Sequence, residues 1–236
     1  MILAAAGAVD HERILRLAEE YYGDMKPANA RAADPARFLG GERREVKRLE
    51  QAHLALAFEA PNQSDDALYT AQIYATALGG GMSSRLFQEL RERRGLAYTI
   101  YAQVGAFDDT GMLTIYAGTS GEQLPELVTL TLDEIRRSAE DMNPAELERA
   151  RAQMKAGLLM GLESPSARAE RNARLVAIWG HVPSLEDTVA RIDAVTLAGL
   201  RAHAVALATS GAAAMALYGP VADAPPLARV RERLAA

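Results

Sequence analysis

Cysteine is absent from the 236 residues of this chain. Disulfides, thiol nucleophiles and thiolate metal sites are therefore excluded. Histidine is scarce as well, with four in the whole chain, and none lies within four residues of another. Neither an H-E-x-x-H nor an H-x-x-E-H motif is present, so the sequence offers no local zinc site. We expect no metal ligands in this chain.

The chain also lacks an excess of positive charge and has few aromatic residues. Lys and Arg number 26 against 31 Asp and Glu, which gives a net charge of −5, and aromatics make up 6%. This balance argues against a nucleic acid partner, because phosphate binding needs a basic surface. The apolar run Met1–Val9 is too short to span a bilayer and has no basic residues before it. We therefore expect no membrane partner. The compartment stays open, with the cytoplasm as default, since any targeting signal would lie upstream of Met1.

Three consecutive glycines, Gly79, Gly80 and Gly81, separate two segments with helical patterns. The first helix, over 67–78, is expected to end there, because glycine adopts positive φ without steric penalty and three in a row do not sustain regular structure. Either Ser83 or Ser84 is expected to cap a second helix that runs to position 94. A glycine follows at position 95, where it suits the left-handed conformation that ends a helix.

The second helix leads directly into a predicted strand, Leu96–Val104, which is rich in aromatic and β-branched residues. Arg91 in the last helical turn and Tyr98 in the strand stand seven residues apart across this corner. Their guanidinium and phenol could converge on a peptide carbonyl or a developing oxyanion. The alternative is that Arg91 is a solvated partner of the helix dipole and Tyr98 a core residue.

The rest of the sequence predicts an α+β fold, in which an antiparallel sheet of about four to six strands carries helices on one face. His53, alone at the head of a strand, is interpreted as structural. Further strands are predicted at 44–49, 53–60, 112–117 and 212–218, and further helices at 124–140, 144–163, 166–179, 185–192, 197–207 and 228–234.

The two ends of the chain resemble each other. Met1–Val9 is predicted as an apolar strand that closes on Gly-Ala-Val before a helix capped by Asp10, and 212–221 is a similar strand that closes on Gly-Pro-Val before the last helix. A duplicated unit explains this. We therefore predict that residues 1–26 are the last strand and helix of a preceding half, 27–42 a linker, and 43–236 the main domain. An unpaired apolar strand is a sheet-edge liability, so Met1–Val9 is expected to pack on the main domain or to form a homodimer.

Four stretches together resemble the M16 family of zinc metallopeptidases, which includes pitrilysin, insulin-degrading enzyme and the processing peptidases. They are Gly79–Tyr101, the hairpin 107–117 with Gly118-Thr119, the segment 149–166, and the N-terminal Ala4–Asp10. The similarity is greatest to the bacterial processing type. It implies that the chain is the C-terminal half of a molecule in which two homologous α+β halves face each other across a chamber.

In that family the other half holds zinc through H-x-x-E-H and a distant Glu, and the C-terminal half supplies an Arg and a Tyr that reach the substrate. The resemblance thus implies that Arg91 and Tyr98 contact a peptide substrate and that Gly79, Gly80 and Gly81 shape the chamber wall. It implies no catalytic residue and no zinc in this chain, which we expect to be inactive alone. The expected partner is a zinc-bearing M16 half or subunit, and the chain is either a truncated gene product or a genuine short subunit.

A second hypothesis remains open. Some proteins of this family are structural subunits of respiratory complexes. In that case the chain would be an assembly module with no role in proteolysis, and Arg91 and Tyr98 would merely pack.

Overall fold

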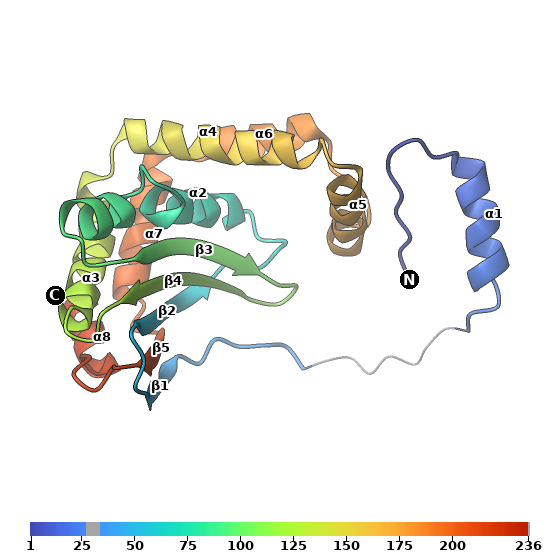
Figure 1. The fold of residues 1–236 in the computed structure, drawn as a ribbon. Helices are drawn as coiled ribbons and strands as arrows, with labels where there is room; N and C mark the ends of the chain where they lie inside the picture. The colour runs from blue at the N-terminus through green and yellow to red at the C-terminus, as the bar shows by residue number, and fades with distance from the viewer. Residues whose placement is uncertain (27–33, 236) are drawn as a thin grey trace. The chain divides into compact units, whose positions relative to one another are not determined.

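The computed structural model describes residues 1–26 and 34–235 (Figure 1). These residues form two compact units. We call residues 36–154 and 190–236 the sheet unit, and residues 1–35 and 155–189 the helical unit. Residues 27–33 of the predicted linker lie outside the described residues.

The sheet unit is built on five strands in the order β1-β5-β2-β4-β3. The strands are β1 (Gly41–Val46), β2 (Ala52–Ala60), β3 (Thr99–Ala106), β4 (Gly111–Thr119) and β5 (Ala213–Gly219). The predicted α+β class is confirmed, but the sheet is mixed, because β1 runs parallel to β5 whereas the other pairs are antiparallel. The sequence predicted an antiparallel sheet, and the β1–β5 pair differs from that prediction. These two strands are far apart in sequence and are not joined by a hairpin, the connection that would make them antiparallel.

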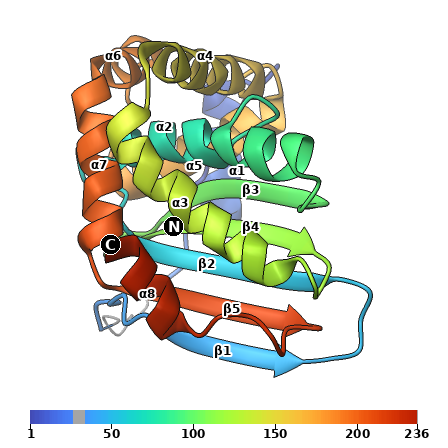
Figure 2. The same ribbon diagram turned by 90° about the vertical axis from the view of Figure 1, so that its left-hand side faces the viewer.

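Four helices lie on the same side of the sheet in Figure 2. They are α2 (Leu68–Gly79), α3 (Leu124–Asp141), α7 (Leu197–Thr209) and α8 (Leu227–Ala235). The strands alternate accordingly: Leu54, Leu56 and Phe58 of β2 are at most 1% exposed. Burial of this apolar face against the helices supplies the core of the unit.

Local chemistry explains where several helices begin. In α4 (Pro144–Gly161), Glu146 N–H donates to Asn143 Oδ1 and Asn143 N–H donates to Glu146 Oε2, which makes a reciprocal cap. Helix α6 (Leu185–Ala194) precedes α7, whose first turn is capped by Thr196, as a threonine just before the predicted helix 197–207 suggests; Gly199 N–H lies 3.0 Å from Thr196 Oγ1. Among the described helices none alone is long and apolar enough to cross a membrane, although α6 and α7 reach that length and composition jointly as a bent pair.

The helical unit contains α1 (His11–Tyr22) and α5 (Pro165–Trp179). As predicted, Asp10 caps α1, accepting from Arg13 N–H at 2.7 Å. The predicted strand at Met1–Val9 is wrong for this chain, where the segment is irregular and Met1 is 80% exposed. A strand forms only when a neighbour accepts its backbone hydrogen bonds, and none of the described strands pairs with it.

Candidate functional site

The glycine triplet ends α2, but not for the predicted reason. None of Gly79, Gly80 and Gly81 has a positive φ. What requires glycine at position 79 is space, because a Cβ there would lie 2.5 Å from Ala102 N and 2.7 Å from Ala102 Cβ. Gly79 thus allows the end of α2 to approach the backbone of β3 closely.

The other two glycines face different neighbours. A Cβ on Gly80 would meet the backbone of Thr76 at 2.6 Å, whereas one on Gly81 would meet only the side-chain amide of Gln153, at 3.3 Å. The Gln153 amide on α4 donates to Gly80 O at 2.6 Å. The loop is therefore held between α2 and α4. Gln153 was not singled out from the sequence, and no local pattern marks it.

The helix after the glycines is a π-helix, η1 (Phe87–Arg93), where an α-helix was expected. Such wide turns are rare and are frequently found at functional sites. The predicted serine cap is absent, since Ser84 Oγ donates to Gly81 O at 2.6 Å and accepts no backbone N–H of the helix. The predicted glycine end is present: Gly95 has φ +63° and its N–H donates to Arg91 O at 3.1 Å.

Arg85 anchors the start of this segment. By spacing alone Arg85 would pair with Glu89 four residues later, but its guanidinium instead donates to Glu146 at 2.6 and 2.7 Å and to Asp141 at 2.5 Å. Burial alone would lower the pKa of Arg85, but its hydrogen bonds to the carboxylates of Glu146 and Asp141 outweigh that effect and raise the pKa above its ordinary value. Glu134 lies 4.0 Å away, and burial raises its pKa even though Arg137 and Arg85 oppose the shift. This buried cluster fixes η1 to α3 and α4.

Arg91 differs from the other arginines of this segment. Arg93 and Arg94 both pair with Glu89, at 3.0 and 2.8 Å. The hydrogen bond from Arg94, and to a lesser extent that from Arg93, lowers the pKa of Glu89, although burial of the carboxylate acts in the opposite direction. Among the described residues Arg91 has no carboxylate partner. Its Cζ lies 4.7 Å from the ring centroid of Phe87, and its side chain is exposed. A stacked but unneutralised guanidinium remains available to a ligand.

Tyr98 is anchored by its backbone and free at its side chain. Its N–H donates to Gly118 O at 2.9 Å, and just before it Leu96 O accepts from the buried Thr119 hydroxyl at 2.6 Å. The side chain of Tyr98 is 74% exposed, so the alternative of a core tyrosine is wrong. Arg91 and Tyr98 therefore present two hydrogen-bond donors from a corner whose backbone is fixed on both sides. Such a pair can hold a peptide carbonyl or stabilise an oxyanion.

The sheet face opposite the helices carries an aromatic group that sequence reasoning did not assemble. Tyr101 stacks on Tyr116 with ring centroids 5.2 Å apart, and the Tyr116 hydroxyl lies 2.8 Å from His53 Nδ1. Tyr218 stands across from His53, at 6.3 Å between centroids. The sequence does indicate this group, because each predicted strand concerned carries a tyrosine or histidine at a position whose side chain points away from the helices.

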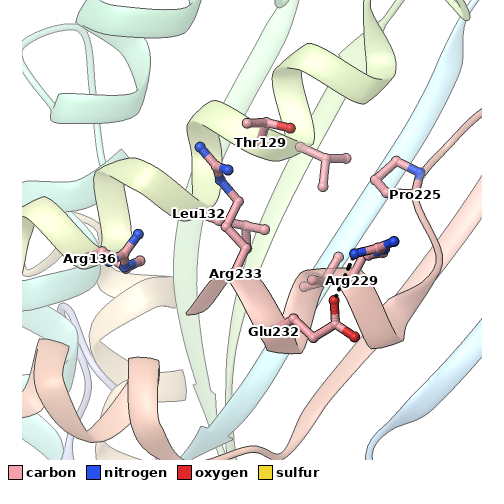
Figure 3. A pocket seen from close by; sticks show the side chains of 9 residues that line it. Thr129, Leu132, Arg136, Pro225, Arg229, Glu232 and Arg233 are labelled. Atoms are coloured by element: carbon pink, nitrogen blue, oxygen red, sulfur yellow. Dashed lines mark hydrogen bonds and ion pairs between the residues drawn. The ribbon is translucent and has the colours of Figure 1, made fainter. Parts of the chain in front are cut away.

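A cavity of about 480 Å³ lies between α3 and α8 and contains none of the predicted site residues (Figure 3). Leu132 and Val230 supply apolar walls, and arginines line its rim. Arg229 pairs with Glu232 at 3.1 Å, and Arg233 makes a two-point pair with Asp133 at 2.9 and 2.6 Å. Arg229 and Arg233 are thus neutralised within the chain, and the pair of Arg233 with Asp133 joins α8 to α3, which favours a structural role.

Across residues 1–26 and 34–235, no group of three or more His, Asp or Glu side chains is placed to hold a metal ion. The donor set of this part of the chain does not fit zinc.

The fold and site define a class of protein: an α+β domain with a mixed sheet, one helical layer and an exposed Arg-Tyr corner. The sequence profile described as "Peptidase M16 inactive domain" matches residues 1–154. The chain belongs to the M16 peptidase family.

Its curated relatives are named as proteases. An uncharacterized zinc protease of Mycobacterium tuberculosis is 35% identical over 228 residues, which are 93% of this chain and 52% of the relative. The uncharacterized zinc protease YmxG of Bacillus subtilis is 31% identical over 229 residues, 95% of this chain and 55% of the relative. The chain thus spans about half the length of the curated relatives it matches.

Solved structures share the fold. A chain of complex III2 from Candida albicans, with Inz-5 bound, has a TM-score of 0.83 at 23% identity, over 96% of this chain and 56% of that one. A protease from Helicobacter pylori has a TM-score of 0.75 at 19% identity, over 91% of this chain and 54% of that one.

Proposed function

We propose that this chain is the substrate-contacting, non-catalytic half of an M16-type zinc metalloendopeptidase. In this proposal it holds a peptide substrate through Arg91 and Tyr98, while a zinc-bearing half, carried elsewhere, cleaves it. The single observation that carries the proposal is the state of Arg91. Of the arginines between positions 85 and 94 it alone has no carboxylate partner among the described residues, although Glu89 lies in the same helix.

The physical role follows from charge. A guanidinium left without a counter-charge on a fixed backbone can donate to a substrate carbonyl without first breaking an ion pair. The Tyr98 hydroxyl adds a second donor at the same corner. Gly79 supports this corner by letting α2 approach β3, the strand that Tyr98 precedes, and in this proposal Gly80 and Gly81 continue the loop that shapes the wall of the chamber. No described residue supplies a metal site, so the proposal assigns zinc to the other half.

The test is a reconstitution assay. The chain is mixed with the half of the Mycobacterium tuberculosis relative that it does not match, and cleavage of an unstructured peptide is followed. We expect no cleavage by the chain alone and cleavage by the mixture. Arg91→Ala and Tyr98→Phe should each lower kcat/KM by about a hundredfold, the usual loss when one oxyanion donor is removed.

Matched variants control for folding and charge. Arg93→Ala removes an exposed arginine of the same helix that Glu89 already neutralises, and Tyr101→Phe removes a hydroxyl from the nearby strand. Both should cleave as the wild type does. If Arg91→Ala and Arg93→Ala lowered kcat/KM by the same small factor, the proposed contact between Arg91 and the substrate would be wrong.

The second candidate is an assembly module with no role in proteolysis. It is favoured by the TM-score of 0.83 to a chain of complex III2, a likeness that covers nearly all of this chain. The same assay separates the two. An assembly module would leave cleavage unchanged in Arg91→Ala and Tyr98→Phe, whereas the substrate-contacting half would not.

A further inference from the structure

Four aromatic rings form a band across the sheet face opposite the helices. The ring of Tyr101 stacks on that of Tyr116 with centroids 5.2 Å apart, and Tyr116 stacks on His53 at 6.1 Å. The ring of Tyr218 follows, 6.3 Å from His53 and tilted by 34°. The four residues come from β3, β4, β2 and β5, which are consecutive in the sheet (Figure 2). This aromatic band therefore runs across the strands.

The rings of the band hold one another in place. The Tyr116 hydroxyl lies 2.8 Å from His53 Nδ1, and Tyr101 supports the Tyr116 ring from the neighbouring strand. At the other end of the band Tyr218 is 44% exposed, and His53 beside it is half-buried. Rings that are fixed by their neighbours and still open to solvent form a stacking surface that loses little conformational freedom when a ligand binds.

The strand register places this surface close to the corner that carries Tyr98. The Tyr98 N–H donates to Gly118 O, and the next residue, Thr99, is the register partner of Gly118. His53 is the partner of Gly118 on the other side, and Tyr218 is the partner of His53. Because neighbouring strands are about 4.8 Å apart, His53 lies about 10 Å and Tyr218 about 14 Å from the start of β3. An extended peptide advances about 3.3 Å per residue, so it covers this distance in about three to four residues.

We propose that His53, Tyr116 and Tyr218 form a subsite for an aromatic side chain of the substrate peptide, about three to four residues from the carbonyl that Arg91 and Tyr98 hold. The inference rests on the proposed function in taking a peptide held at that corner as the ligand. Contact between the rings removes apolar surface of both partners from water, and aromatic rings prefer offset or edge-to-face arrangements. His53, interpreted as structural from the sequence, thereby has a binding role besides its contact with Tyr116.

The surroundings of the band favour a neutral ring over a cationic side chain. Ring faces also attract cations, but Glu45, the register partner of Tyr218 on β1, is already paired with Lys47 at 3.1 Å. A bound Arg or Lys would lose hydration there without gaining a free counter-charge from Glu45. The row of residues that continues from Tyr116 consists of Ala55 and Ala216, which add apolar surface.

The first test measures cleavage. This chain is mixed with the half of the Mycobacterium tuberculosis relative that it does not match, and the substrates are unstructured peptides of a Gly-Ser-Ala background that differ only in the position of one Phe. We expect Phe at one position, about three to four residues from the cleaved bond, to lower KM about tenfold relative to Ala there, which is the effect of one good aromatic pair. The value of kcat should not change, because this contact is made equally in the ground state and the transition state.

Variants of the band separate the ring from the hydroxyl. Tyr218→Ala and His53→Ala should each abolish the preference for Phe, whereas Tyr218→Phe keeps the ring and should retain it. The matched control is Phe107→Ala, which removes a ring that is 56% exposed directly after β3, at the end away from Tyr98. This control should keep the preference. Because Tyr218 is exposed, neither of its variants should alter thermal unfolding.

The second test measures binding without the other half and so does not depend on cleavage. The Phe peptide and its Ala counterpart, each labelled with fluorescein, are titrated with the full chain, and fluorescence anisotropy gives their Kd values. We expect the Phe peptide to bind about tenfold more tightly. This ratio should persist in Arg91→Ala, where both peptides bind more weakly, and should disappear in Tyr218→Ala.

The outcomes separate this inference from the proposed function. A preference for Phe in binding that depends on Tyr218, without cleavage by the mixture, keeps the subsite and contradicts the proposed function. Cleavage that depends on Arg91 and Tyr98 but is equal for Phe and Ala at every position does the reverse. The inference is overturned by a preference for Arg over Phe, by a preference for Phe that persists in Tyr218→Ala, or by the lack of any preference in both tests.

Discussion

Replacing Gly79 by alanine tests the close approach on which the corner of the candidate site depends. The added Cβ would lie 2.5 Å from Ala102 N and 2.7 Å from Ala102 Cβ, both on a central part of β3. Neither is the end of a flexible side chain, so α2 or β3 has to move. Overpacking of this kind typically lowers the free energy of unfolding by about 1–3 kcal/mol. Because both close atoms belong to the rigid Ala102, we expect Gly79→Ala to lie near the upper end of that range.

A gain offsets part of this cost. Alanine is favoured over glycine inside a helix by about 1 kcal/mol, and Gly79 is the last residue of α2. The net destabilisation is therefore about 2 kcal/mol. For a chain of this length that corresponds to a fall in Tm of roughly 4–8 °C. Urea unfolding followed by circular dichroism measures the free energy directly.

Gly81→Ala is the matched control in the same triplet. Its Cβ would meet only the amide of Gln153 at 3.3 Å, which a side-chain rotation relieves. We expect the free energy of unfolding to change by less than about 0.5 kcal/mol. Equal changes in the two variants, or a more stable Gly79→Ala, would refute the reasoning that space and not backbone conformation selects glycine at position 79.

Two further predictions concern buried charge. His203 packs against Tyr74, its Nε2 has no hydrogen-bond partner among the described residues, and burial lowers its pKa to about 4. Because the unfolded chain binds the proton at a higher pH than the folded chain, stability should be complete above pH 6.5 and fall by up to about 3 kcal/mol as the pH drops toward 4. His203→Phe should remove this part of the pH dependence in urea titrations. Arg85→Ala leaves the buried Glu146 without its counter-charge and should cost about 3–5 kcal/mol in urea unfolding, whereas the exposed Arg93→Ala should cost less than about 1 kcal/mol.

Features set by local chemistry could be predicted from the sequence. Asp10 and Thr196 cap helices because their side chains reach a backbone N–H three residues later, and Gly95 adopts positive φ because the helix ends there. The alternation of Leu54, Leu56 and Phe58 in the sequence likewise indicates which face of β2 is buried. In each case the cause lies within a few residues of the effect.

Features set by distant neighbours could not be predicted. The parallel pairing of β1 with β5 joins strands from opposite ends of the main domain. Arg85 leaves its neighbour in sequence for carboxylates on α3 and α4, because charge-assisted hydrogen bonds to two carboxylates outweigh one i,i+4 contact. The π-helical turn of η1 has no sequence signal of its own, and the reason for Gly79 lies on β3.

The candidate site shows how these two kinds of cause combine. Spacing in the sequence marks Arg91 and Tyr98 as a pair, yet four arginines between positions 85 and 94 are chemically alike. Tertiary structure distinguishes them by neutralising three of them: Arg85 through Glu146, and Arg93 and Arg94 through Glu89. Because Glu89 already serves two arginines, Arg91 keeps its charge for a ligand. Glu89→Gln should therefore leave the contacts of Arg91 unchanged. It should also free the guanidinium groups of Arg93 and Arg94, which would then compete with Arg91 for the ligand.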